Sequence, residues 1–159
     1  LLYKLTSHPD ETATILPTVG FNVEEVDYDD FRLTIYDVGG GDAIKKLWWS
    51  LFIECDAVIL VVDSDDRERL GDLRTYLMAM LRGDATRTFT MLVYANKSDL
   101  PRAMRVSEIT AGLGLATLRT CTWHCQQCCA TTGEGLSEGL AWLVSHLNEP
   151  PKDRGRERG

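Results

Sequence analysis

Leu92-Val93-Tyr94-Ala95-Asn96-Lys97-Ser98-Asp99-Leu100-Pro101 is the part of the sequence that indicates the fold of this chain most clearly. Its apolar first half is closed by polar residues and a proline, which is typical of the carboxyl end of a buried strand in a parallel sheet. Ligands of open α/β sheets bind at that edge of the sheet. The sequence therefore predicts a parallel sheet with a ligand site at residues 96–99.

The polar residues of this loop favour guanine as the ligand. The carboxylate of Asp99 can accept two parallel N–H bonds, a pattern that guanine offers through N1–H and its 2-amino group and that adenine lacks. Lys97 can lay its apolar stem against a base, and Asn96 can tie the loop to neighbouring backbone. An ordinary polar strand-to-helix turn explains four residues about as well, so the other motifs of the chain decide.

The composition is that of one globular domain. A chain of 159 residues, 44% hydrophobic and 26% charged, suits a single core. A formal net charge of −7 argues against a duplex nucleic-acid partner, because such proteins neutralise many phosphates with Lys and Arg. No apolar run approaches the ~20 residues of a membrane span. We expect one domain over residues 1–148 and a disordered tail over residues 149–159.

Apolar runs and turns alternate along the chain as in a doubly wound α/β fold, with a mostly parallel sheet and helices on both faces. The unbroken β-branched run at residues 57–62 predicts a central strand covered on both faces. The residue pattern also predicts an antiparallel hairpin near the start of the chain. The predicted strands cover residues 23–28, 31–36, 57–62, 88–94 and 122–128, and the predicted helices cover residues 1–5, 45–52, 70–81, 106–113 and 136–147.

Two loops near the start offer groups for phosphate and magnesium. The hydroxyl of Thr18 can complete the oxygen shell of a magnesium ion that bridges phosphates. Asp37 can hold the same ion through water, and the glycines after it let the backbone N–H of Gly40 approach a phosphate closely. Thr18 bonding its own loop, and a three-glycine turn that only reverses the chain, remain alternatives.

Four cysteines crowd around the last predicted strand. Zinc sites usually take ligands in C-x2-C pairs separated by a loop, whereas these cysteines lie in one stretch whose alternate side chains point to opposite faces. We therefore favour reduced structural thiols, with a metal or redox site as the alternative. The cluster consists of Cys121, Cys125, Cys128 and Cys129, next to His124.

The small residues after that strand predict the rest of a base pocket. Cys129, Ala130 and Thr131 carry side chains short enough for their backbone N–H groups to reach a base carbonyl, the O6 that marks guanine.

Together these residues resemble the Arf and Arf-like small GTPases, from Leu1 to about Leu147. The Gly-Phe-Asn and Asp-Val-Gly-Gly sequences are similar to Arf-like proteins rather than to Ras-like or Rab-like ones. The match rests on Pro17-Thr18-Val19-Gly20-Phe21-Asn22-Val23, Asp37-Val38-Gly39-Gly40, Val61-Val62-Asp63-Ser64, Asn96-Lys97-Ser98-Asp99-Leu100-Pro101 and Cys129-Ala130-Thr131, in the family's order and spacing.

The resemblance implies a GTP/GDP switch with Mg²⁺, in which nucleotide exchange re-registers the hairpin at residues 23–36. It implies effector, exchange-factor and GTPase-activating partners, and a cytoplasmic protein that works in vesicle transport at the Golgi or other endomembranes. Family members often reach membranes through an amphipathic helix, which would lie upstream of Leu1. The implied site residues are Thr18, Gly40, Asn96, Lys97, Asp99, Cys129, Ala130 and Thr131 for nucleotide, Thr18 and Asp37 for metal, and Phe21, Tyr36 and Leu51 for effectors.

The chain departs from the family pattern in its effector and hydrolysis residues. Relatives generally carry Trp where Tyr36 stands and Tyr where Leu51 stands, so we expect a different choice of effector. The family also places a glutamine after the Gly-Gly turn to orient the attacking water, and this chain has Gly41 there. We therefore assign no catalytic residue and expect slow or negligible hydrolysis.

The largest departure concerns the phosphate loop. The family's G-x4-G-K-[ST] pattern and the strand before it should lie just ahead of Leu1, and no such pattern occurs in the 159 residues. We expect a natural product that extends upstream, and expect the 159 residues alone to bind GTP poorly. A nucleotide-free pseudo-GTPase or protein-interaction module is the alternative.

Overall fold

The computed structural model describes residues 21–28, 31–41, 45–82 and 88–147. Within them the predicted strands and helices are confirmed, with bounds that shift by a few residues, and a short 3-10 turn is added; the helix predicted at residues 1–5 lies outside this part. The elements are β1 (Phe21–Tyr28), β2 (Phe31–Val38), α2 (Lys45–Glu54), β3 (Ala57–Asp63), α3 (Leu70–Arg82), β4 (Phe89–Asn96), α4 (Val106–Leu113), η1 (Leu115–Thr117), β5 (Cys121–Gln127) and α5 (Leu136–Leu147).

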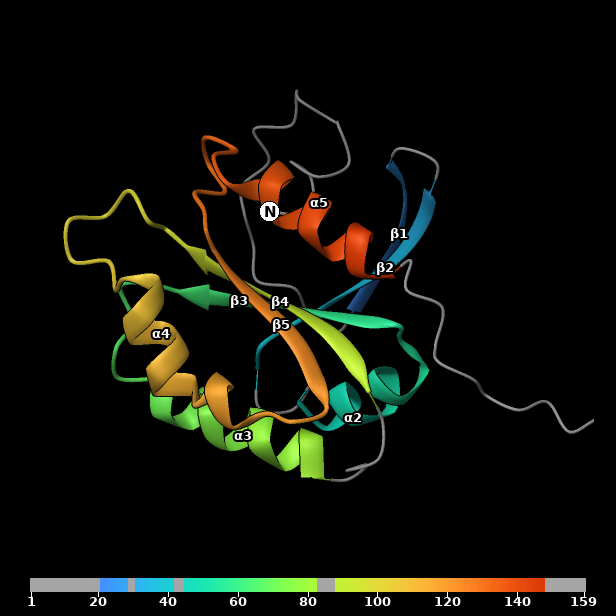
Figure 1. Ribbon diagram of the computed structural model, residues 1–159, viewed down its shortest axis with the longest axis horizontal. Coiled ribbons are helices and arrows are strands. Elements are labelled where there is room, and N and C mark those ends of the chain that lie inside the picture. Colours follow the sequence, from blue (N-terminus) through green and yellow to red (C-terminus); the bar gives the residue numbers. More distant parts are fainter. Residues whose placement is uncertain (1–20, 29–30, 42–44, 83–87, 148–159) are drawn as a thin grey trace, which may run out of the picture.

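A three-stranded parallel sheet of order β3-β4-β5 forms the centre of the fold. Helices α3 and α4 cover one face of this sheet and α5 covers the other (Figure 1). Strand β4 lies in the middle, and its residues 89–95 are all buried. A strand covered on both faces must be apolar without alternation, which is why this stretch indicates the fold most clearly.

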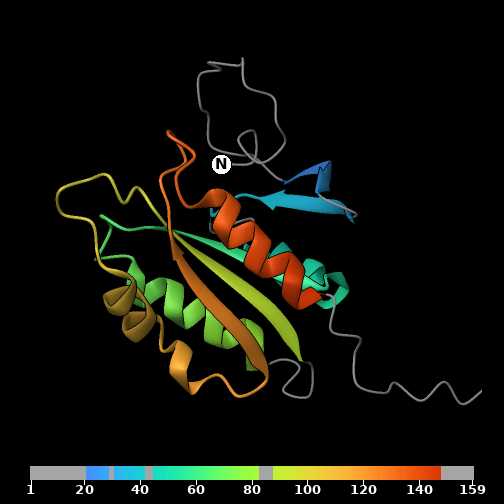
Figure 2. The same ribbon diagram turned by 45° about the horizontal axis from the view of Figure 1, so that its top comes forward.

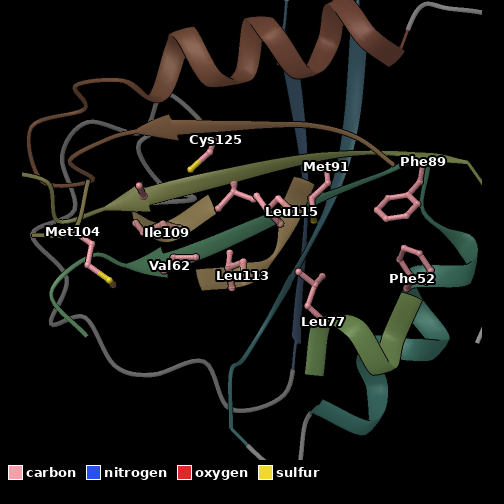
Figure 3. Close-up of a cluster of buried hydrophobic side chains, with 12 residues drawn as sticks. Phe52, Val62, Leu77, Phe89, Met91, Met104, Ile109, Leu113, Leu115 and Cys125 are labelled. Atoms are coloured by element: carbon pink, nitrogen blue, oxygen red, sulfur yellow. The ribbon is translucent and has the colours of Figure 1, made fainter. Parts of the chain in front are cut away.

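Two apolar clusters hold the layers together, one on each face of the sheet. The cluster on the α3 and α4 face includes Met91, Leu77 and Ile109, and α2 reaches it through Phe52, whose ring meets Phe89 edge to face at 5.0 Å (Figure 3). The cluster on the opposite face joins Leu92 and the other α5-facing side chains of β4 to α5. The helices α3 and α5 therefore each bury an apolar face against the sheet.

The hairpin of β1 and β2 forms a separate two-stranded sheet. Its inner face packs Tyr28, Phe31 and Leu33 against the cluster under α5, and the turned view places the hairpin beside that helix (Figure 2). Residues on one face of a strand alternate with those on the other, so alternate side chains, such as Val23 and Tyr36, face outward. Among the described residues, the hairpin thus packs against the body of the protein through this inner face.

Strand β3 differs from its prediction as a central strand. In the described part of the chain it is an edge of the three-stranded sheet, because no described strand pairs with its outer side. An open groove of about 880 Å³ separates it from β2, lined by residues 35–38 of β2, residues 57–63 of β3, and side chains of α2 and α3. Val61, on the α5 side of β3, is 47% exposed. We call the groove between β2 and β3 the inter-sheet groove.

In residues 21–28, 31–41, 45–82 and 88–147, no helix combines the length and the apolar character needed to cross a bilayer.

The contact between α5 and β4 leaves no room for a larger side chain at Gly139. A Cβ at Gly139 would lie 2.5 Å from the ring of Tyr94, whose hydroxyl is held by a 2.6 Å hydrogen bond to the carbonyl of Leu136. We predict that Gly139→Ala destabilises the fold by about 1–3 kcal/mol in urea unfolding. Gly71 of α3 is the matched control, since a Cβ there meets nothing within 4 Å. Gly71→Ala should stabilise by about 0.5–1 kcal/mol, and equal effects of the two changes would contradict this packing.

Candidate functional site

Two loops meet at the carboxyl edge of the parallel sheet, one after β4 and one after β5. The side-chain oxygen of Asn96 accepts a hydrogen bond from the amide of Ala130 at 2.9 Å, and the thiol of Cys128 lies 3.8 Å from the same oxygen. The amide of Ser98 donates to the carbonyl of Cys128 at 3.1 Å. The sequence-based interpretation of Asn96 as a tie between loops is confirmed in these contacts.

The amides predicted to read a base carbonyl already have partners inside the protein. The amide of Cys129 donates to the carbonyl of Glu134 at 2.9 Å, and that of Ala130 donates to Asn96. A base carbonyl at this loop would therefore share or replace the oxygen of Asn96 as acceptor for Ala130. The role of Thr131 in base binding stays a prediction, since its described contact is a 3.0 Å approach of its hydroxyl to the thiol of Cys129.

Lys97 turns back from this loop to the end of β3. Its backbone has a φ of 62°, in the left-handed region, and its ammonium donates to the carboxylate of Asp63 at 2.7 Å. The other oxygen of Asp63 accepts the amide of Asp65 at 3.0 Å. The sequence pointed to Asp63 only as part of the family match. Its contact with Lys97 depends on the register of β3 with β4, which pairs Asp63 with Asn96 and which no sequence motif shows.

The charge of Asp63 is favoured by these contacts. Burial acts to raise the pKa of Asp63, but the hydrogen bonds from Lys97 and the Asp65 amide, with the positive charge of Lys97, outweigh it and hold that pKa below its ordinary value. The carboxylate of Asp63 therefore stays ionised at neutral pH.

Cys125, Cys128 and Cys129 are buried, and Cys121 is half-buried. Burial raises the pKa of Cys121 to about 12, of Cys125 to about 11 and of Cys128 to about 12, so these thiols remain protonated at neutral pH. Hydrogen bonds with Thr131 and Thr132 lower the pKa of Cys129 instead. Within residues 21–28, 31–41, 45–82 and 88–147, no group of three or more His, Cys, Asp or Glu side chains could hold a metal ion.

The candidates for magnesium and phosphate lie on the other side of the inter-sheet groove. Asp37 in β2 and Gly40 after it line the groove, as does Asp63 at the end of β3, while Thr18 lies outside the described residues. The turn at residues 39–41, the Gly turn, is anchored from α2, because the indole of Trp48 donates to the carbonyl of Gly39 at 3.1 Å. Sequence reasoning missed this anchor. The carboxylate of Asp37 is a hard oxygen donor that suits Mg²⁺.

The residues predicted to face effectors divide between two surfaces. Phe21 and Tyr36 lie on the outer face of the hairpin with exposures of 50% and 42%, and Val23, paired with Tyr36 across the strands, adds a third exposed apolar side chain at 48%. Leu51 of α2 is half-buried and lines the inter-sheet groove with Tyr36. The sequence did not single out Val23.

The parallel sheet, its helices on both faces and the paired loops at its carboxyl edge define the class, a small-GTPase fold. Residues 1–147 match the model of the ADP-ribosylation factor family. A similar solved structure is the Arl6 BBS3 small GTPase from Trypanosoma brucei with a bound nucleotide analogue, GppNp; it has a TM-score of 0.80 and 29% identity, covering 91% of this chain and 88% of that chain. The chain belongs to the ADP-ribosylation factor family, whose members bind guanine nucleotide as switches and act with regulators and effectors.

The tie between the two loops predicts a local effect of changes at Asn96. Asn96→Ala removes the acceptor of the Ala130 amide, so hydrogen exchange of that amide should accelerate at least about tenfold, and stability should fall by about 1–3 kcal/mol. Asn96→Asp keeps an oxygen at the same place and is the matched control, with protection retained. Continued protection of Ala130 in Asn96→Ala would show that another group holds the loop.

The ion pair of Asp63 and Lys97 predicts a pH dependence. A carboxylate whose folded pKa lies below its unfolded value stabilises the fold above the unfolded value, and this stabilisation is lost as pH falls through the folded one. The stability difference between wild type and Asp63→Asn should therefore be present at pH 7, be below about 1 kcal/mol for such a solvent-accessible pair, and shrink below about pH 4. Urea unfolding at a series of pH values measures it. A difference that stays constant down to pH 3 would contradict the assignment.

Proposed function

We propose that this protein is an Arf-like switch in vesicle transport at endomembranes that binds GTP or GDP with Mg²⁺ and hydrolyses GTP slowly. The observation that carries slow hydrolysis is Gly41, at the position where the family holds a water-orienting glutamine. Family membership alone does not imply slow hydrolysis, vesicle transport or the individual binding residues, which we propose for this protein.

The proposed base site consists of the two tied loops. Asp99 would accept the N1–H and 2-amino group of guanine, the stem of Lys97 would lie against the ring, and Ala130 would offer its amide to O6. Asn96 would keep the loops in register. The hydrogen bonds among residues 96–98 and 128–130 support this arrangement, since they hold the two loops together before a ligand binds.

The proposed hydrolysis defect follows from what Gly41 lacks. In related switch GTPases a glutamine amide orients the attacking water, and glycine has no side chain to do this. Gly41 is exposed at the mouth of the inter-sheet groove, and a Cβ placed there meets nothing within 4 Å. A Cβ at this position would therefore not clash, and we attribute the defect to the missing amide group.

The phosphate cradle would have to be completed at the inter-sheet groove. Without the family's phosphate loop, about five charge-assisted hydrogen bonds to the nucleotide phosphates would be lost. Their loss would remove roughly 7–15 kcal/mol of binding free energy, and a nanomolar complex has only about −12 kcal/mol in total. A strand placed between β2 and β3 would pair with the outer edges of both and end beside Asp63. The groove supports this proposal because it separates two sheet edges that carry no described partner strand.

A nucleotide-free interaction module is the second candidate. The exposed apolar face of Phe21, Val23 and Tyr36 favours it, because this face could hold a protein partner whether or not nucleotide is bound. Absence of nucleotide from the natural protein would select this reading.

The hydrolysis defect predicts a gain of function. Gly41→Gln should raise the single-turnover rate of GTP hydrolysis at least about tenfold, since positioned polar groups at a reacting centre contribute 10²–10³ in rate elsewhere. Gly41→Ala is the matched control; it restricts the backbone in the same way but adds no amide, so its rate should equal that of wild type. The measurement is the formation of GDP and phosphate in a single turnover of natural protein that has been preloaded with GTP. A wild-type rate equal to that of Gly41→Gln would refute the defect.

A further inference from the structure

The contact between Asp63 and Lys97 joins two elements that are distant in the sequence. Asp63 is the last residue of β3, and in the parallel ladder it lies opposite Asn96, the last residue of β4. The ladder continues one step further, because the amide of Ser64 donates to the carbonyl of Asn96 at 2.9 Å. The backbone therefore fixes the distance between Asp63 and the start of the base loop.

The carboxylate of Asp63 is itself oriented before it meets Lys97. One of its oxygens accepts the amide of Asp65, which leaves the other to receive the ammonium of Lys97 at 2.7 Å. Such a two-sided hydrogen bond restricts the rotation of a short side chain. Asp63 thus presents a fixed acceptor rather than a freely moving charge.

Lys97 adopts a backbone conformation that needs support from its surroundings. Among the residues described by the structure it is the one non-glycine with positive φ, at 62°. Non-glycine residues in this region are strained and persist where neighbouring contacts determine them. The contact with Asp63 draws the ammonium back toward β3, so the aliphatic stem between the two ends is held over the end of the sheet.

We propose that Asp63 is a positioning residue for the guanine nucleotide: by anchoring the ammonium of Lys97, it holds the stem of that lysine where the base would stack. This inference rests on the proposed base site and adds to it a residue outside the two base loops. It also connects the base loop to the inter-sheet groove, because Asp63 lines that groove.

A double-mutant cycle on the dissociation of a fluorescent GDP analogue from the natural full-length protein tests the proposal. Asp63→Asn should speed dissociation about two- to fivefold, the range of a solvent-accessible ion pair. Lys97→Met keeps an apolar stem but has no ammonium for Asp63 to hold. In the Lys97→Met background, Asp63→Asn should therefore have no further effect.

Asp66→Asn is the matched control, because Asp66 is a carboxylate on the same turn that pairs with Arg69 and not with Lys97. Its dissociation rate should equal that of wild type. An unchanged rate in Asp63→Asn, or the same acceleration with and without Lys97, would overturn the proposal, since the second result is what a purely structural role predicts. Wild-type protein that binds no analogue would instead reject the proposed function, and the inference with it.

Discussion

The parallel ladder around β4 is the constraint on which the rest of the structure depends. Residues 91–95 are at most 1% exposed, since α5 covers one face of the strand and α3 and α4 cover the other. The register of this ladder brings Asp63 opposite Asn96, and Gln127 opposite Ala95. Three strands therefore end at one edge, and the loops that follow them can contact one another.

The contacts at that edge, rather than any single motif, hold the residues of the site in place. Asn96 binds the loop after β5 through the amide of Ala130, and Lys97 binds the end of β3 through Asp63. The site is thus braced from both neighbouring strands. The opposite side of the inter-sheet groove carries Asp37 and the Gly turn, held from α2 by Trp48. The groove lies between the base side and the magnesium side of the proposed nucleotide site.

Much of this arrangement could be predicted from sequence, because apolar periodicity and glycine positions report local structure. The helix predicted at residues 106–113 has the bounds of α4, and Gly114 after it has the left-handed φ of 71° that suits glycine. What failed depends on partners distant in sequence. The apolar run of β3 predicted a central strand, but a residue run cannot show whether its outer edge is paired. The roles of Asp63 and Trp48 likewise arise from register and helix placement, which no motif contains.

Intact mass and nucleotide content of the protein purified from its native source show whether it is a guanine-nucleotide switch. We expect bound GTP or GDP, close to one per protein, and a mass above that of the 159-residue chain, because a phosphate loop is needed to hold the nucleotide. A mass equal to that of the 159 residues with no nucleotide would contradict the switch and leave an interaction module.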